Sequence, residues 1–278
     1  MRLHRSALFV NTLPTSAGRP LRLLGIALAL VLVGNFGAWW IKTDGGRIEV
    51  TGLKLPTENG QWITADLFRP TTATAKNPAP VVVVCPGFER SKETLDSYSI
   101  ELARRGMAVI TIDPYNQGAS SATMERRSAS VEGYGVVPMV EYIFDTPNLN
   151  YLDKTRIGAT GYSAGGNAVL QSTSVFGGKQ ARAPRKTAAK GADSAKASAA
   201  PERPAAAAPG KLAAVFVGGY VLTLTDAVLA TVNSNVGMDY ALHDEGSYRN
   251  ELGNPDMRKA PEALRLVNSV LEKNQRVA

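Results

Sequence analysis

The hydrophobic pattern of the chain starts with an uninterrupted apolar run. Residues 23–41 carry no charge, and their one strongly polar side chain is Asn35. A helix needs roughly 20 apolar residues to cross a bilayer. The run is apolar on all sides and lies near the N-terminus, which favours a membrane-spanning helix over the buried core helix of a soluble domain.

The charges beside this run predict its orientation. Four arginines precede it, whereas the charges of Lys42, Asp44 and Arg47 after it nearly cancel. Cytoplasmic flanks carry the excess of positive charge, so we expect residues 1–22 in the cytoplasm and the body of the protein outside. Trp39 and Trp40 are typical of the membrane interface, and no small-x-small cleavage pair precedes them. We therefore favour an uncleaved anchor over a cleaved signal peptide.

Short apolar segments of a different period follow the anchor. Residues 46–55 and 61–70 alternate in part and are separated by Pro56 and Asn59-Gly60, which predicts an antiparallel strand pair. Residues 81–85 read VVVVC, a β-branched run typical of a parallel strand buried on both faces.

The rest of the body alternates between helical and strand-like spacing. Strands are expected at 107–113, 156–161, 213–220 and 235–242, and helices at 91–105, 132–144, 164–176 and 261–273. Alternating strands and helices predict a doubly wound, mostly parallel sheet of the α/β class.

We place this α/β domain at residues 47–278. The composition indicates that one segment interrupts it. Residues 179–211 consist mainly of Ala, Pro, Ser, Gly and basic side chains, with eight basic residues against two acidic ones. This stretch supplies most of the net charge of +7, and it lacks the apolar side chains that would offset its ordering entropy. We interpret it as a flexible insertion. A nucleic-acid-binding tail is the alternative, but no aromatic residues for base stacking are interleaved, so no nucleic-acid partner is expected.

The reactive side chains are few. The chain has one cysteine, Cys85, and two histidines, His4 and His243. A structural Cys/His zinc site needs about four such ligands, so none is expected, and neither is an intrachain disulfide. We predict no metal and no cofactor, and interpret Cys85 as a small buried residue at a strand end rather than a nucleophile.

A possible nucleophile lies between a predicted strand and a predicted helix. Residues 161–165 read Gly-Tyr-Ser-Ala-Gly, the G-x-S-x-G pattern of a nucleophile elbow in its required strand-turn-helix context. A sharp turn strains the backbone of Ser163, and Gly161 and Gly165 remove side chains that would collide there. The Ala164 amide, at the helix N-terminus, can then point at a developing oxyanion.

At this point the chain resembles the α/β-hydrolase family, in particular its dienelactone-hydrolase-like and peptidase-like branches. Besides the elbow, residues 85–88 (CPGF) are similar to the oxyanion loop of the family, and residues 113–120 (DPYNQGAS) to its D-x-x-G-x-G-x-S loop. The resemblance implies that the Phe88 amide is the second oxyanion donor beside that of Ala164.

The resemblance also implies an acid and a histidine after the serine, in that order. Asp244 follows the predicted strand 235–242 and is the preferred acid, with Asp226 and Asp239 as weaker candidates. No histidine follows Asp244. His243 is a weak candidate for the base, because neighbouring side chains in an extended segment point to opposite faces. A shortened hydrolase, either a fragment or a diverged copy, would explain the missing histidine.

Two functions are consistent with these features. The first is a membrane-anchored serine hydrolase that cleaves an ester, thioester or peptide through an acyl-enzyme at Ser163, with an incomplete triad in this chain and a small molecule or peptide as substrate. The alternative is a non-catalytic, hydrolase-like binding or scaffold domain.

Overall fold

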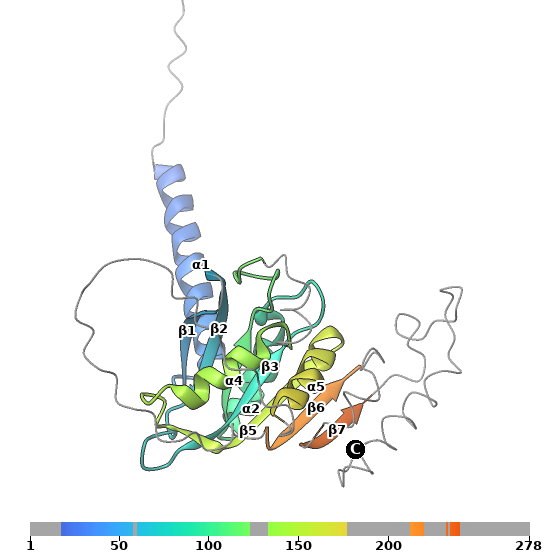
Figure 1. The fold of residues 1–278 in the computed structure, drawn as a ribbon. Coiled ribbons are helices and arrows are strands. Elements are labelled where there is room, and N and C mark those ends of the chain that lie inside the picture. The colour runs from blue at the N-terminus through green and yellow to red at the C-terminus, as the bar shows by residue number, and fades with distance from the viewer. Residues whose placement is uncertain are drawn as a thin grey trace, which may run out of the picture. The chain divides into compact units, whose positions relative to one another are not determined.

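The computed structural model describes residues 18–57, 60–122, 133–176, 212–219, 232 and 234–239 (Figure 1). The chain forms two compact units, residues 1–41 and 42–278. The predicted insertion, the predicted helix at 261–273, Asp226, His243 and Asp244 lie outside the described residues.

The first unit contains most of helix α1 (Gly18–Lys42). Within the described residues, the segment Pro20–Lys42 is the one helix long and apolar enough to cross a membrane, and none of it is buried. Signal sequences share these properties. Phe36, Trp39 and Trp40 form an aromatic cluster near its C-terminal end, with ring centroids 5.8–6.3 Å apart.

The second unit is built on a mixed sheet of seven strands in the order β1-β2-β4-β3-β5-β6-β7. Its strands are β1 (Ile48–Pro56), β2 (Trp62–Pro70), β3 (Ala79–Cys85), β4 (Ala108–Ile112), β5 (Leu152–Tyr162), β6 (Ala214–Gly218) and β7 (Asn235–Asp239). β2 pairs antiparallel with both β1 and β4, whereas all other pairs are parallel. The carboxyl ends of β3 to β7 therefore meet at one edge of the sheet.

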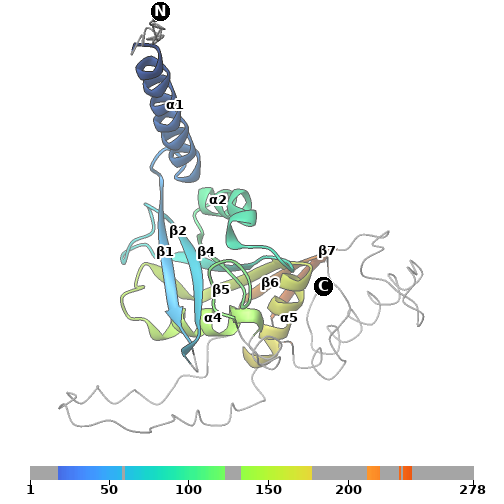
Figure 2. The ribbon, with the colours of Figure 1, turned by 90° about the horizontal axis from the view of Figure 1, so that it is seen from above.

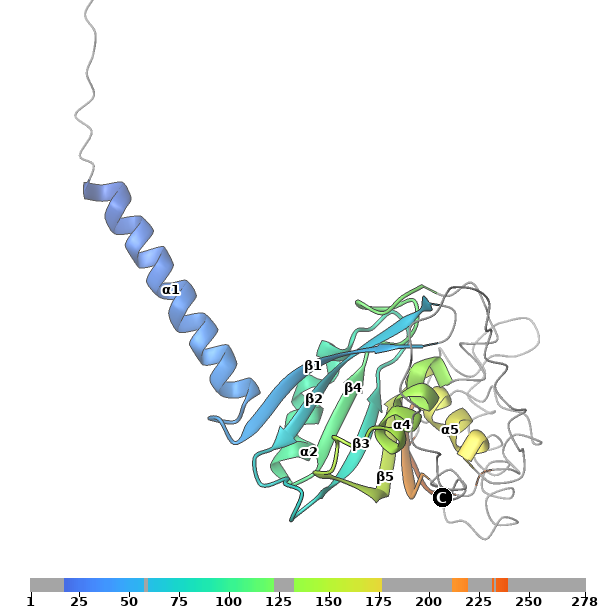
Figure 3. The ribbon, with the colours of Figure 1, turned by 60° about the vertical axis from the view of Figure 1, so that its left-hand side comes forward.

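Helices cover both faces of this sheet, as Figures 2 and 3 show. The 3-10 turn η2 (Lys92–Leu95) leads into α2 (Asp96–Arg104), whose Ile100 packs with Val84 on one face. On the other face, α4 (Val136–Asp145) and α5 (Ala164–Phe176) pack with Val81 and Val83. Alternate residues of β3 thus enter two separate apolar clusters, as the pleat of a strand requires. The α/β fold class and the antiparallel pair predicted from the sequence are confirmed.

One predicted helix starts later than expected. The α-helical part of the predicted segment 132–144 begins only at Val136, after the 3-10 turn η3 (Gly133–Gly135). Gly133, Tyr134 and Gly135 all have positive φ angles, of 55°, 51° and 112°. Left-handed residues in succession cannot continue a right-handed helix, so the turn sets the helix start.

Candidate active site

Ser163 lies on the sharp turn between β5 and α5, at the carboxyl edge of the sheet. Its φ angle is 55°, in the left-handed region that non-glycine residues rarely adopt. Hydrogen bonds hold this conformation on both sides: the Ser163 amide donates to the Gly218 carbonyl at 2.8 Å, and the Ser163 carbonyl accepts from the Asn167 amide at 3.1 Å. The residue is half-buried.

The two glycines of the motif lie where no side chain fits. A Cβ atom on Gly161 would collide with the Gly165 carbonyl group, and one on Gly165 would collide with the carbonyl oxygens of Cys85 and Pro86. The backbone of α5 therefore packs directly against the end of β3. This close approach is what brings the serine turn beside the loop that follows β3.

That loop, residues 86–92, is called the oxyanion loop below. A Cβ atom placed on Gly87 would lie 3.5 Å from the Ser163 Cβ and 3.3 Å from the Tyr162 carbonyl oxygen, so the loop backbone passes directly beside the serine. Glu89, the residue after Phe88, is also left-handed, with φ 54°. No acceptor among the described residues binds the amide of Phe88 or of Ala164. Their role as oxyanion donors stays a prediction.

Cys85 ends β3 just before this loop and is completely buried. Burial raises the pKa of its thiol to about 12, because the thiolate would lose its hydration. A thiol this far from ionisation is a poor nucleophile at neutral pH, consistent with the packing role predicted for it.

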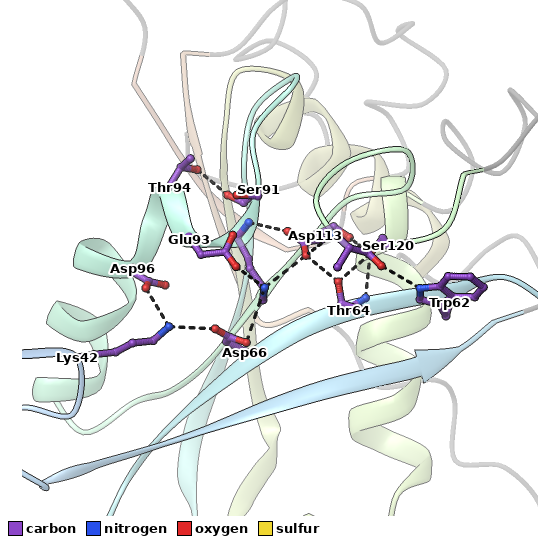
Figure 4. A network of polar contacts seen from close by, with 12 residues as sticks. Lys42, Trp62, Thr64, Asp66, Ser91, Glu93, Thr94, Asp96, Asp113 and Ser120 are labelled. Atoms are coloured by element: carbon purple, nitrogen blue, oxygen red, sulfur yellow. Dashed lines mark hydrogen bonds and ion pairs between the residues drawn. The ribbon is translucent and has the colours of Figure 1, made fainter. Parts of the chain in front are cut away.

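A polar network fixes the far end of the oxyanion loop (Figure 4). The buried carboxylate of Asp113, just after β4, accepts the Lys92 amide at 2.8 Å, the Thr64 hydroxyl at 2.7 Å and the Ala119 amide at 3.1 Å. The Lys92 ammonium lies 3.5 Å from the same carboxylate. Nearby, the Gln117 side-chain oxygen accepts the Arg90 amide at 2.7 Å.

The network continues away from the serine through charged pairs. The Lys92 ammonium also lies 2.5 Å from Glu93 and 4.0 Å from Asp66. Burial alone would lower the pKa of Lys92. The hydrogen bond to Glu93 and the surrounding carboxylates together raise it by more, so the net shift of the pKa is upward. Asp66 pairs in turn with Lys42 at 3.2 Å, and Lys42 with Asp96 at 3.1 Å. Burial raises the pKa of Asp96, and the bond from Lys42 opposes that shift.

Asp239 is a described aspartate that lies near the serine turn, through the end of β6. The Ser163 amide donates to the carbonyl of Gly218, and the amide of the next residue, Gly219, donates to Asp239 Oδ1 at 3.1 Å. Sequence analysis placed Asp239 inside the strand 235–242, whose residues 240–242 lie outside the described ranges. Asp239 pairs with Gly218 at the carboxyl end of β6. Asp239 thus lies at the carboxyl edge, where its side chain is exposed. The preferred acid, Asp244, and the candidate base, His243, lie outside the described ranges and stay predictions.

Sequence analysis missed the exposed aromatic side chains beside the serine. The side chains of Phe88 and Tyr162 are 71% and 62% exposed, although both residues adjoin the site. Tyr162 is the variable position before the serine in the motif, so its place was readable from the sequence but its exposure was not. Within the described ranges, no group of three or more His, Cys, Asp or Glu side chains is arranged to hold a metal ion.

Together, the mixed, mostly parallel sheet and the strained serine after β5 define a member of the α/β-hydrolase class with an esterase-like fold. More specifically, the chain belongs to the PET hydrolase-like family, whose model matches residues 40–195. The match includes the oxyanion loop and the serine turn. No curated protein matches the sequence.

Solved structures agree on the fold. Thermogutta terrifontis esterase 2, in a form phosphoramylated by tabun, superposes with a TM-score of 0.55 at 14% identity, covering 83% of this chain and 80% of the esterase. A dienelactone hydrolase-like promiscuous phosphotriesterase from metagenomic libraries gives a TM-score of 0.51 at 14% identity, covering 83% of this chain and 79% of that protein. At this identity, the similarity concerns the fold alone.

Proposed function

We propose that the protein is a membrane-anchored serine hydrolase that cleaves an ester through an acyl-enzyme on Ser163. The observation that carries the proposal is the left-handed backbone of Ser163 on a turn packed against the oxyanion loop. A strained backbone costs stability and persists only where the surrounding structure enforces it. Such strain concentrates at functional sites.

In the proposed reaction, Ser163 Oγ attacks the carbonyl carbon of the ester and its proton passes to a base. The carbonyl oxygen becomes an oxyanion, to which the Phe88 and Ala164 amides donate hydrogen bonds. The C–O bond to the alcohol then breaks, and the base returns the proton to the leaving alkoxide. Water hydrolyses the acyl-enzyme by the same steps. His243 is the weak candidate for the base, and Asp244 is the preferred acid, with Asp226 and Asp239 as the weaker candidates.

Two features favour an ester with an apolar acyl group over a thioester or peptide. Phe88, in the loop that passes the serine, and Tyr162, next to the serine in the chain, are exposed and offer apolar surface, which would lose contact with water on binding such a group. The PET hydrolase-like family and the esterase among the similar structures both point to ester cleavage. A small-molecule substrate is therefore the partner we propose.

A fluorophosphonate probe tests the nucleophile. Labelling forms a bond between Ser163 Oγ and phosphorus, breaks the P–F bond and releases fluoride, while the serine proton goes to the base. Ser163→Ala should abolish labelling without changing the thermal midpoint. Ser174→Ala is a matched control, because this helix α5 serine donates only to the carbonyl of Gln171, three residues earlier. Absence of Ser163-dependent labelling would contradict catalysis and favour the non-catalytic alternative.

The base requires its own test. If His243 accepts the serine proton, His243→Ala should slow labelling by roughly 100-fold or more, the size of effect that a positioned general base contributes. Labelling at the wild-type rate would show that another group serves as the base.

Anchoring is proposed for α1, with residues 23–41 in the membrane and the N-terminus in the cytoplasm. The arginines before the run and the nearly neutral flank after it support this orientation. Protease added to intact spheroplasts that express the protein should digest the second unit. Full protection would reverse the orientation, and release of the protein by alkaline carbonate would argue for a cleaved signal instead.

A further inference from the structure

We propose that Asp113 is a positioning residue that holds the oxyanion loop in the conformation in which the Phe88 amide faces the substrate. The inference rests on the proposed function, because it concerns the donor that would stabilise the oxyanion at Ser163. Asp113 itself lies one loop away, after β4, and touches no reacting atom.

The contacts of Asp113 join three segments of the chain. Its Oδ1 atom accepts the amide of Lys92 at the end of the oxyanion loop. Its Oδ2 atom accepts the hydroxyl of Thr64 on β2 and the amide of Ala119 in its own loop. A carboxylate is the side chain that suits this place, because both of its oxygens accept and neither donates. Gly118 fits the arrangement too, since a Cβ atom there would collide with the carboxylate.

The oxyanion loop needs such a restraint. Glu89 has a left-handed backbone that an unrestrained loop would leave, and it directly follows Phe88. The amides of Arg90 and Lys92, on the far side of Glu89, are bound by Gln117 and Asp113. Both acceptors come from the loop after β4, so this loop fixes the segment that sets the direction of the Phe88 amide.

The effect should concern the transition state more than substrate binding. An oxyanion donor stabilises charge that develops only as the serine attacks, and losing one typically costs about 100- to 1,000-fold in rate. A Phe88 amide that is only less well oriented should reduce the rate by less than the loss of the whole donor would. We therefore expect a lower maximal rate with nearly unchanged affinity for the probe.

Asp113→Asn tests this, because the substituted amide keeps one acceptor oxygen and turns an N–H group toward one of the donors. The maximal rate of fluorophosphonate labelling should fall at least about 10-fold, and the probe concentration that gives half of this rate should change less than about twofold. Hydrogen exchange of the amides at 87–92 should become faster. Asp153→Asn is the matched control: it changes another aspartate that binds an amide, a hydroxyl and a basic side chain, but at the opposite end of β5.

Thr64→Val provides a second, milder variant in case Asp113→Asn does not fold. It removes one donor to the carboxylate while preserving side-chain shape, and should shift both readouts in the same direction by a smaller amount. Rates and exchange equal to those of Asp153→Asn would overturn the inference. If wild-type protein is not labelled, the proposed function fails, and exchange at 87–92 alone decides: faster exchange supports the positioning role, and unchanged exchange refutes it.

Discussion

Two aspartates at the carboxyl edge of the sheet occupy opposite environments. Asp113, after β4, is buried and binds two amides, a hydroxyl and an ammonium group. Asp239, at the end of β7, is exposed, and its carboxylate accepts only the Gly219 amide among the described donors. Both oxygens of the Asp113 carboxylate already accept hydrogen bonds from the surrounding segments. No described donor binds the second oxygen of the Asp239 carboxylate, and a residue that orients a base needs such an oxygen.

The largest expected difference between the two aspartates is in stability. Asp113→Ala should lower the free energy of unfolding by about 3–5 kcal/mol, because it leaves buried donors, including the Lys92 ammonium, without their acceptor. Asp239→Ala should cost less than about 1 kcal/mol, as exposed substitutions usually do. Urea unfolding of the full chain in mild detergent measures both. Equal losses for the two variants would remove the contrast on which the comparison rests.

The next effect concerns the identity of the acid. Asp244→Asn should slow fluorophosphonate labelling of Ser163 by roughly 100-fold or more, since the base would lose the carboxylate that orients it. Asp239→Asn should change the rate by less than about threefold, because Asp244 is the preferred acid. The opposite result would assign the acid to Asp239, whose place at the end of β7 the structure describes.

Much of the fold could be predicted because its signals are local. The β-branched run at 81–85 and the apolar spacing of 164–176 each lie within one element, and the bounds of α5 agree with the prediction. The serine turn was also readable, since its five residues are consecutive. Helix α4 was misjudged at its start, because the left-handed turn at 133–135 depends on packing: a Cβ on Gly135 would collide with Ile63 of β2.

The network around Asp113 could not be predicted for a related reason. Its members come from β2, the oxyanion loop and the loop after β4, and the sheet order that brings them together is not written in any one segment. The sequence pattern of residues 113–120 indicated the loop, but it did not predict which groups Asp113 binds. Side-chain exposure at Phe88 and Tyr162 likewise depends on tertiary packing.

The smallest expected effect concerns Glu93, one of the three carboxylates around the Lys92 ammonium. Glu93 bonds to the same ammonium as Asp113, but its side chain is 54% exposed, so its ion pair is screened by water. Glu93→Gln should therefore reduce stability at pH 7 by only a few tenths of a kcal/mol. Removing the exposed partner of Lys92 should thus cost far less than removing the buried one.

The pH dependence of this small effect has a definite sign. The hydrogen bond from Lys92 lowers the pKa of Glu93 from 4.5 to about 2. A carboxyl whose pKa falls on folding stabilises the protein above its unfolded pKa, and the contribution disappears as the pH drops through the folded value. The difference in thermal midpoint between wild type and Glu93→Gln should hence be full at pH 7 and shrink between about pH 4.5 and pH 2. In a Lys92→Met background the difference should shrink but not vanish, because the hydrogen bond from the Ser91 side chain also lowers the pKa of Glu93. An undiminished difference there would show that the ion pair with Lys92 contributes nothing.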